Sequence, residues 1–268
     1  MSKMADLELA HHLADVASDI ALGWWGSGVP ALAKPDGSPV SEADLAVEAA
    51  LLDVLAVERP GDSVLTEESG EHPGSGRRWI LDPIDGTAPF LAHGRAWGTH
   101  IALEVDSVLT IGIITRPTER KRWWASRGNG AHVSAAGSRW PRTRAVRVSE
   151  AASLGAARIG GFLEPRSAVA PAVAGAAEWV ADAVCLLGDL AEARVEAAVD
   201  EGGSLWDRAP GVLIVQEAGG RVTDLSGGRE WADPVLVYSN GLVHDELLEL
   251  LRAARVPRAG TRPTGPFD

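Results

Sequence analysis

Residues Trp79–Thr87, with the sequence WILDPIDGT, join a strand, a turn and the start of a helix in one short segment. The apolar residues at its beginning are typical of a buried strand, and Asp82 ends that strand. An ionised carboxylate there is costly unless a positive group meets it. Pro83 keeps Asp82 extended, so that after the turn Asp85 and the carbonyl of Ile84 can face the same point. The segment therefore predicts carboxylate and carbonyl oxygens around a shared cation.

The residues that follow predict a phosphate site. Gly86 supplies a flexible turn, and Thr87 lies where a helix would begin. Pro89 is compatible with a first helical turn, because an amide at that position has no intrahelical partner. The N–H groups and the positive dipole end of such a helix start attract a phosphate.

Two further acidic clusters lie beside predicted secondary structure. Glu67 belongs to Thr66–Ser69 (TEES), directly after a strand-like run, and Asp207 belongs to Leu205–Asp207 (LWD), which opens a helix. Hard oxygen ligands suit Mg²⁺. Two or more such ions, about 3.5–4 Å apart, can hold the attacking water and the leaving oxygen of an in-line displacement. In this scheme Glu67 ligates one ion and Asp207 another, while Thr87 and Glu67 orient and deprotonate the water.

A structural alternative exists for the Asp82 and Asp85 pair. Asp-Pro and Asp-Gly are common turn formers, so these acids could simply shape a strand end and a turn. A lone Asp-Gly would favour that interpretation. Three acidic clusters, each beside a strand or helix end, favour metal binding instead.

Apolar periodicity predicts helices first and strands next. Helices are expected over residues 5–24 and 42–57, with a loop over 26–39 between them. Short strand-like runs, then a mixed second half, complete the pattern. The runs are 63–66, 78–81, 100–105, 109–115 and 122–126, followed by a helix over 205–218, a strand over 234–238 and a helix over 244–254. This order favours an α+β or layered α/β fold.

We expect one catalytic unit, residues 1–268, built from two packed halves. The N-terminal α+β half, about residues 1–145, carries most of the metal motifs, and the C-terminal α/β half covers about 146–254. Residues 255–268 are rich in Pro, Gly and Arg and are expected to form a flexible tail.

Composition excludes several classes of protein. The 268 residues include 25 basic and 37 acidic side chains, and the net charge of −12 argues against a general nucleic-acid binder. The single cysteine, Cys185, can form no internal disulfide and no cysteine-based zinc site. No apolar run approaches the ~20 residues of a membrane span, and Met1–Leu13 lacks the pattern of a signal peptide. We expect a cytoplasmic protein that contacts neither nucleic acid nor membrane.

The acidic strings, taken together, resemble the signature motifs of the inositol monophosphatase family. The matching strings are Thr66–Ser69, Asp82–Thr87, Trp206–Gly220 and, for a Thr-x-x-Asp element, Val40–Asp44. They occur in the family's order over about residues 38–251. The resemblance implies a layered αβαβα sandwich, Mg²⁺-dependent hydrolysis of a phosphomonoester with two or three ions per site, and a homodimer.

The same resemblance implies a role for each residue of these motifs. Glu67, Asp82, Asp85, Asp207 and the Ile84 carbonyl would be metal ligands. Gly86 and Thr87 would contact the phosphate, and Thr87 with Glu67 would activate the water. Asp44 would hold the Thr87 and water network or a weaker metal.

Within that family the chain is most similar to the actinobacterial type of histidinol-phosphatase. The similar strings include Ser41–Glu48, Arg122–Ala131, Ser204–Asp207 and Ser239–Leu248. The chain departs from that branch at Ala88-Pro89 and at Ala92-His93-Gly94, and the stretch 188–206 is shorter. These departures lie where they affect the substrate rather than the metal ligands.

Three residues are candidates for contact with the organic part of the substrate. Asp189 and Asp200 could lie over it, and an acid there would suit the ammonium group of histidinol phosphate. Both could equally be exposed charges on a loop or helix end. His93 follows the phosphate segment and could touch the substrate, although a lone histidine is more often a polar loop residue.

The leading hypothesis is a Mg²⁺-dependent phosphatase that converts L-histidinol phosphate to L-histidinol. One alternative keeps the chemistry and changes the substrate to an inositol, sugar, cyclitol or nucleoside phosphate. The other is a homologue without catalytic activity, which the clustered carboxylates oppose because buried unpaired acids are costly.

Overall fold

The computed structural model describes residues 4–28, 30–33, 39–135, 143–164, 166–180 and 184–254. The predicted tail, 255–268, lies outside these residues. Among the described residues, no helix is both long and apolar enough to cross a bilayer.

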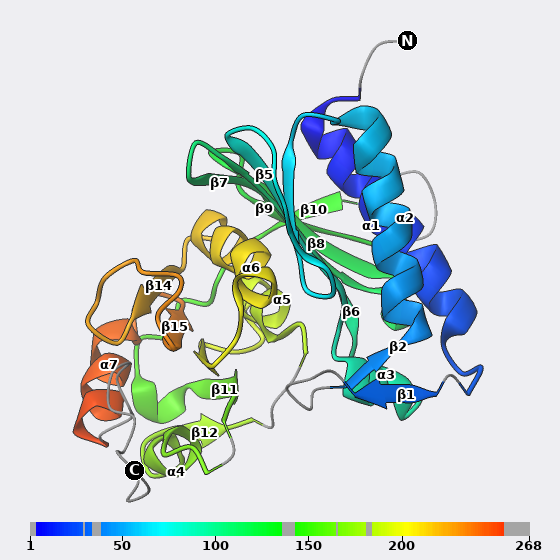
Figure 1. Cartoon of the computed structure of the whole chain (residues 1–268). Helices are drawn as coiled ribbons and strands as arrows, with labels where there is room; N and C mark the ends of the chain where they lie inside the picture. Colours follow the sequence, from blue (N-terminus) through cyan, green and yellow to red (C-terminus); the bar gives the residue numbers. More distant parts are fainter. Residues whose placement is uncertain are drawn as a thin grey trace, which may run out of the picture.

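A large sheet forms the N-terminal part of the molecule (Figure 1). Its strand order is β10-β9-β8-β7-β6-β5-β3-β4, with β3 and β5 parallel and the other pairs antiparallel. The strands are β3 (Ser63–Thr66), β4 (Gly70–His72), β5 (Arg77–Asp85), β6 (Gly98–Val105), β7 (Val108–Arg116), β8 (Lys121–Ser126), β9 (Ala131–Ala135) and β10 (Thr143–Val146).

A smaller sheet follows in the C-terminal part. Its order is β12-β11-β13-β15-β14. The strands are β11 (Arg158–Phe162), β12 (Glu178–Trp179), β13 (Ala197–Glu201), β14 (Arg221–Asp224) and β15 (Val235–Ser239). A separate two-stranded ribbon is made by β1 (Ala31–Ala33) and β2 (Pro39–Ser41).

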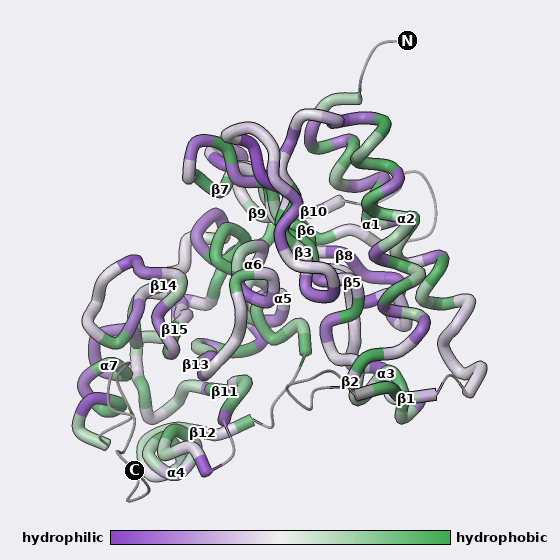
Figure 2. Tube along the Cα trace, in the orientation of Figure 1, coloured by the Kyte–Doolittle hydropathy of each residue, from purple (hydrophilic) through white to green (hydrophobic). Residues whose placement is uncertain are grey.

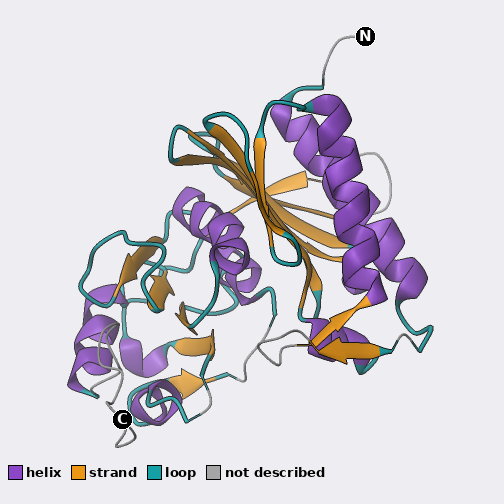
Figure 3. Ribbon diagram, in the orientation of Figure 1, coloured by secondary structure: helices purple, strands orange, loops and turns teal. Residues whose placement is uncertain are grey.

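Helices separate and cover the two sheets, as Figure 3 shows. Helices α1 (Asp6–Trp24) and α2 (Glu42–Glu58) pack on the outer face of the large sheet. Helices α5 (Leu186–Ala191) and α6 (Leu205–Glu217) lie between the two sheets, and α4 (Val169–Ala174) and α7 (His244–Ala253) pack together beside the small sheet. The short α3 (Thr87–Leu91) follows β5. The predicted α+β fold with αβαβα layers is confirmed.

Apolar side chains fill the spaces between these layers, and Figure 2 shows hydrophobic segments along the packed helices and strands. One buried cluster joins α1 and α2 to the large sheet, with Leu13 and Trp79 among its members. A second joins α6 to both sheets. Gly112 of β7 lets α6 approach closely, since a Cβ there would lie 2.6 Å from the carbonyl oxygen of Pro210. This approach brings the start of α6 over the acidic end of β5.

The sequence located most of the long elements. The predicted strand 63–66 and helix 42–57 correspond to β3 and α2. The loop predicted over 26–39 is wrong in part, because β1 and β2 pair within that region. Each of these strands is only three residues long, and the pairing depends on contacts that local propensity does not encode.

Candidate metal and phosphate site

The end of β5 presents its two aspartates at different positions relative to β6. Asp82 pairs with His100 and Asp85 pairs with Gly98, and the register shifts between the two aspartates. This irregularity turns the chain as the Asp-Pro-Ile-Asp sequence predicts. Gly86 then adopts φ 84°, and a Cβ there would lie 2.9 Å from the Ala96 carbonyl oxygen. Only glycine accommodates that conformation and that space at low cost.

Asp82 is buried, and Asp85 and Asp207 lie half-buried beside it, so that the three form a group of like charges. Burial, followed by the charges of Glu67, Asp85 and Asp207, raises the pKa of Asp82 well above its usual range. Burial and the neighbouring acids raise the pKa of Asp85 to about 7, and burial with Asp85 raises that of Asp207 to about 7. Oδ1 of Asp82 is buried and has no hydrogen-bond partner among the described residues. A divalent cation would relieve both the repulsion and the missing contact, so the donor set fits a metal ion.

Glu67 follows β3 and is held against the end of β5. Its backbone N–H donates to the Leu81 carbonyl at 3.3 Å. Glu48 of α2 fixes the residues on either side, because its carboxylate accepts hydrogen bonds from the Thr66 hydroxyl and, at 3.0 Å, from the Glu68 N–H. Glu67 lines the same cavity as Asp82 and Asp85, and its charge contributes to the raised pKa values of both.

Asp207 reaches the cluster from the first turn of α6. The Ser204 N–H donates to its Oδ2 at 2.5 Å, which fixes the start of the helix. Residues 82 and 207, far apart in sequence, are thus brought together by the packing of α6 on the large sheet.

Asp44 connects α2 to the start of α3. Its fully buried carboxylate accepts hydrogen bonds from the Ser41 N–H at 2.8 Å, the Ser41 hydroxyl at 2.6 Å and the Thr87 hydroxyl at 3.0 Å. Burial raises the pKa of Asp44, against these hydrogen bonds. The Thr87 hydroxyl also lies 3.2 Å from the Ile84 carbonyl oxygen. Thr87 is therefore oriented by Asp44, as the family resemblance implies, and also by the Ile84 carbonyl.

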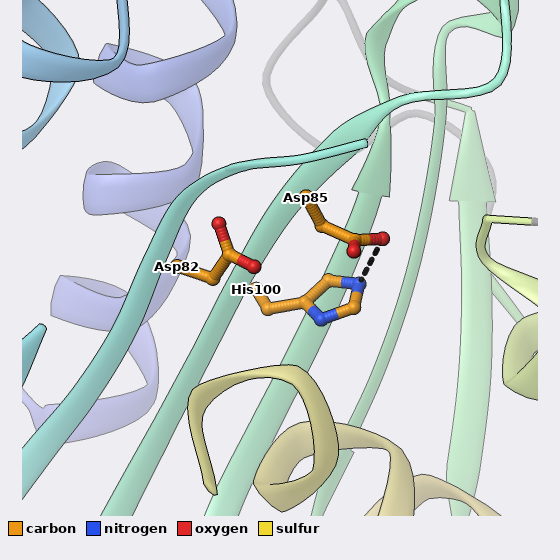
Figure 4. Close-up of side chains that lie close together, drawn as sticks. All are labelled: Asp82, Asp85 and His100. Atoms are coloured by element: carbon orange, nitrogen blue, oxygen red, sulfur yellow. Dashed lines mark ion pairs between the residues drawn. The ribbon is translucent and has the colours of Figure 1, made fainter. Parts of the chain in front are cut away.

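His100 is a site residue that sequence analysis did not single out. Its Nε2 lies 3.3 Å from Asp85 Oδ2 (Figure 4). Its Nδ1 lies 3.1 Å from the Asp207 carbonyl oxygen. Burial lowers the pKa of His100 to about 4, despite the nearby acids. The available signal was its place on the strand next to β5, which a sequence without strand pairing does not reveal.

A cavity of about 460 Å³ extends from the acidic cluster toward the C-terminal half. Glu67, Asp82, Ile84, Asp85, Gly86, Thr87 and Asp207 line it, together with His100 and Asp200. Its other wall is largely apolar and includes Ala88, Pro89, Phe162, Leu163, Val184 and Leu187. Phe162 keeps 66% of its surface exposed, so it stands at the open side.

The three predicted substrate contacts have different positions. Asp200 lines the cavity, but Arg208 holds its carboxylate through two hydrogen bonds of 2.9 and 3.0 Å. Asp189 does not belong to the described lining and pairs with Arg194 at 3.1 Å. His93 is exposed in a turn after α3 and does not line the cavity either. The structure thus brings Asp200 to the cavity and leaves Asp189 and His93 outside its described lining.

The family model of the inositol monophosphatases matches residues 8–256. The chain belongs to this family. It is accordingly a phosphomonoesterase, and the family is metal-dependent.

Individual proteins similar to this chain carry different names. A Streptomyces griseus protein named glucose-1-phosphate thymidylyltransferase is 57% identical over 252 residues, which cover 92% of this chain and 96% of that protein. The histidinol-phosphatase of Mycobacterium tuberculosis is 38% identical over 258 residues, which cover 92% of this chain and 98% of that protein. The solved structure of the extragenic suppressor protein SuhB from Bartonella henselae superposes with a TM-score of 0.83 at 26% identity, covering 91% of this chain and 97% of that one.

Proposed function

We propose that this chain hydrolyses a small phosphomonoester at the acidic end of the cavity with the help of Mg²⁺. The observation that carries the proposal is the group of Asp82, Asp85 and Asp207, in which burial and the charges of neighbouring acids raise all three pKa values. Carboxylates in that state suit a divalent cation. With Glu67 and the Ile84 carbonyl, they supply the oxygen ligands for two or three ions.

The bound ions would neutralise the phosphate and lower the pKa of the attacking water. The protein's own groups would then position the reactants. Gly86 and Thr87 contact the phosphate at the start of α3. Asp44 orients the Thr87 hydroxyl, which accepts a hydrogen bond from the water when its own proton is donated to Asp44. Glu67 takes the proton of that water as it attacks phosphorus in line with the leaving oxygen.

L-Histidinol phosphate is the first substrate to test. The support is the similarity to relatives named histidinol-phosphatase, which are 38% and 34% identical to this chain. Its imidazole would face the apolar wall formed by Pro89 and Phe162. This proposal requires phosphate release from histidinol phosphate to be faster than from other esters.

A sugar phosphate is the second candidate, and one contact favours it. The ammonium group of histidinol phosphate needs an acid, but Asp200 is already neutralised by Arg208. The name of the Streptomyces griseus relative includes a sugar phosphate, glucose 1-phosphate. A neutral polyol could use the Asp200 carboxylate as an acceptor without displacing the arginine.

One assay separates these candidates. Phosphate release is measured with Mg²⁺ on histidinol phosphate, inositol 1-phosphate, glucose 1-phosphate and a nucleoside monophosphate. A kcat/KM for histidinol phosphate at least about 10-fold above the others supports the first candidate, a difference of about 1.4 kcal/mol in transition-state binding. A higher value for the sugar phosphate supports the second. Absence of phosphate release from every ester, with Mg²⁺ present, would contradict the proposal as a whole.

We further propose that the protein is a cytoplasmic homodimer, as the family resemblance implies. Light scattering coupled to size-exclusion chromatography tests the assembly. A monomer at micromolar concentration would contradict it.

A further inference from the structure

His100 lies in the acidic cluster, where it offers a nitrogen atom rather than an oxygen atom as a possible metal ligand. It lies on β6 directly opposite Asp82 of β5, and only 5% of its surface is exposed. Figure 4 shows its ring next to Asp85, with Asp82 on the neighbouring strand. One ligand atom from each of Asp82, Asp85 and His100 lies within 4.8 Å of the other two. Two ligands of one ion with bonds of about 2.0–2.2 Å can be no more than about 4.4 Å apart, so small side-chain shifts bring all three onto one ion.

The hydrogen bond on the far side of the ring determines which nitrogen faces the cluster as a ligand. Nδ1 lies 3.1 Å from the backbone carbonyl of Asp207, which can only accept. Nδ1 therefore carries a proton, and in the neutral ring Nε2 presents a lone pair. This is the arrangement by which a backbone carbonyl fixes the tautomer of a metal-binding histidine.

That lone pair points at another acceptor. Nε2 lies 3.3 Å from Asp85 Oδ2, and it has no hydrogen-bond partner among the described residues. Oδ1 of Asp82 is buried and also without a partner in that part of the chain. Two buried acceptors and a carboxylate facing one another need a cation between them.

We propose that His100 Nε2 is a nitrogen ligand of a divalent ion shared with Asp82 and Asp85. An imidazole ligand suits Zn²⁺ and similar transition metals, whereas an all-oxygen set suits Mg²⁺. The consequence is a site whose preference is shifted toward transition metals. This inference rests on the proposed function only in that the same carboxylates bind metal.

The first test needs no variant. The full-length protein, freed of metal by chelation and loaded with Mn²⁺, is studied by electron spin-echo envelope modulation. A ¹⁴N coupling from a directly bound imidazole is expected. A spectrum with no such coupling would overturn the proposal, and His100 would then be an ordinary ion-pair partner of Asp85.

The second test compares affinities for Zn²⁺ and Mg²⁺ by competition with a chelating indicator. In His100→Asn the amide can still donate to the Asp207 carbonyl, but Nε2 is lost. We expect the ratio of Zn²⁺ to Mg²⁺ affinity to fall by about 10-fold or more. The matched control is His132→Asn on β9, a half-buried histidine that stacks on Trp124 and does not line the cavity. An unchanged ratio in His100→Asn, or an equal fall in the control, would refute the inference.

Phosphate release with Mg²⁺, measured on the same wild-type preparation, separates this inference from the proposed function. Release without a ¹⁴N coupling would reject His100 as a ligand and retain the phosphatase. A ¹⁴N coupling without release from any ester would retain the ligand and reject the proposed function.

Discussion

The acidic residues at the two ends of the cavity have opposite kinds of partner. We call the part around Asp82, Asp85 and Asp207 the metal end, and the part around Asp200 the substrate end. At the metal end, within the described part of the chain, no arginine or lysine forms an ion pair with Asp82, Asp85 or Asp207. At the substrate end, Arg208 holds Asp200 in a two-point ion pair. An acid that the protein leaves without a counter-charge is available to an external cation, whereas a neutralised acid serves mainly the fold. The partner of a carboxylate, more than its residue type, therefore defines its role.

The largest effect is expected from Asp82→Asn at the metal end. Loss of one buried charge should reduce Mg²⁺-dependent turnover at least about 100-fold, because a central ligand is weakened. The metal-free variant should unfold at an equal or higher temperature than the wild type, since repulsion within the cluster falls. Phosphate release and thermal unfolding in EDTA measure the two effects. The control is Asp53→Asn, which changes an exposed acid on α2. Near-normal turnover of Asp82→Asn would contradict the assignment of Asp82 as a metal ligand.

The next effect belongs to the substrate end. Arg208 is 1% exposed and donates to Asp200 and to the carbonyls of residues 231, 233 and 234. Arg208→Met should lower the free energy of unfolding by about 3–5 kcal/mol, because it leaves the half-buried Asp200 carboxylate without its counter-charge and three carbonyls without their donor. Arg194→Met, which removes an exposed partner of Asp189, should cost about 0–1 kcal/mol. Chemical denaturation measures both. Equal stability of the two variants would contradict the prediction that the pair of Arg208 stabilises the fold more than the surface pair of Arg194.

The pH dependence of metal-free stability tests the unpaired acids directly. The folded pKa of Asp85 and Asp207 is about 7, above the ordinary 3.8, so the folded state binds more protons between these values. Their contribution to stability is therefore complete below pH 3.8 and is lost as pH rises through about 7. From pH 6.5 to 8 we expect a loss of roughly 1 kcal/mol for each group.

The chosen window largely avoids an opposing effect. Burial lowers the pKa of His11 to about 3 and those of His100 and His244 to about 4, so the stabilising contribution of these three histidines rises with pH up to about 6.5. Denaturation in EDTA at pH 6.5 and 8 should show a smaller loss for Asp85→Asn than for the wild type. Metal-free stability that increases across this window in the wild type would contradict the assignment of unpaired acids.

The smallest expected effect concerns Tyr238, which lines the substrate end of the cavity. Tyr238 is fully buried and lines the cavity, and its hydroxyl has no partner among the described residues. Tyr238→Phe should leave the free energy of unfolding unchanged or slightly higher, because no hydrogen bond is lost. KM for a hydroxyl-bearing ester should rise by up to about 10-fold, the value of one hydrogen bond, with kcat retained. A clear loss of stability with an unchanged KM would assign the hydroxyl to the fold instead.

The residues of the metal end were predictable because their signals are local. A strand that ends in Asp-Pro-Ile-Asp, a glycine and threonine at a helix start, and an aspartate in the first turn of another helix are each visible within a few positions. The roles of these ligands stay predictions until a metal is bound and measured. The candidate substrate contacts were harder to place. The sequence contains Asp200 and Asp189, but it does not reveal that each forms an ion pair with an arginine.

Part of the fold was missed for a similar reason. Strands β11 and β13 contain RIGGF and AAVDE, which have few β-branched or aromatic residues. β11 pairs with β13, and β13 also pairs with β15, and these pairings supply what local propensity lacks. His100 was missed for the same reason, since its position in the site follows only from the pairing of β6 with β5, which sets it opposite Asp82.

The amino-acid sequence alone determined the fold class, the family motifs and the acids that could bind metal, because strand ends, turns and helix starts depend on neighbouring residues. Tertiary structure decided which of those acids remain without a counter-charge and which histidine joins them. The contact between His100 and Asp207 spans 107 positions. Such a contact depends on how α6 packs on the large sheet. The free energy of that packing is the sum of contributions from many side chains, so no single motif encodes it.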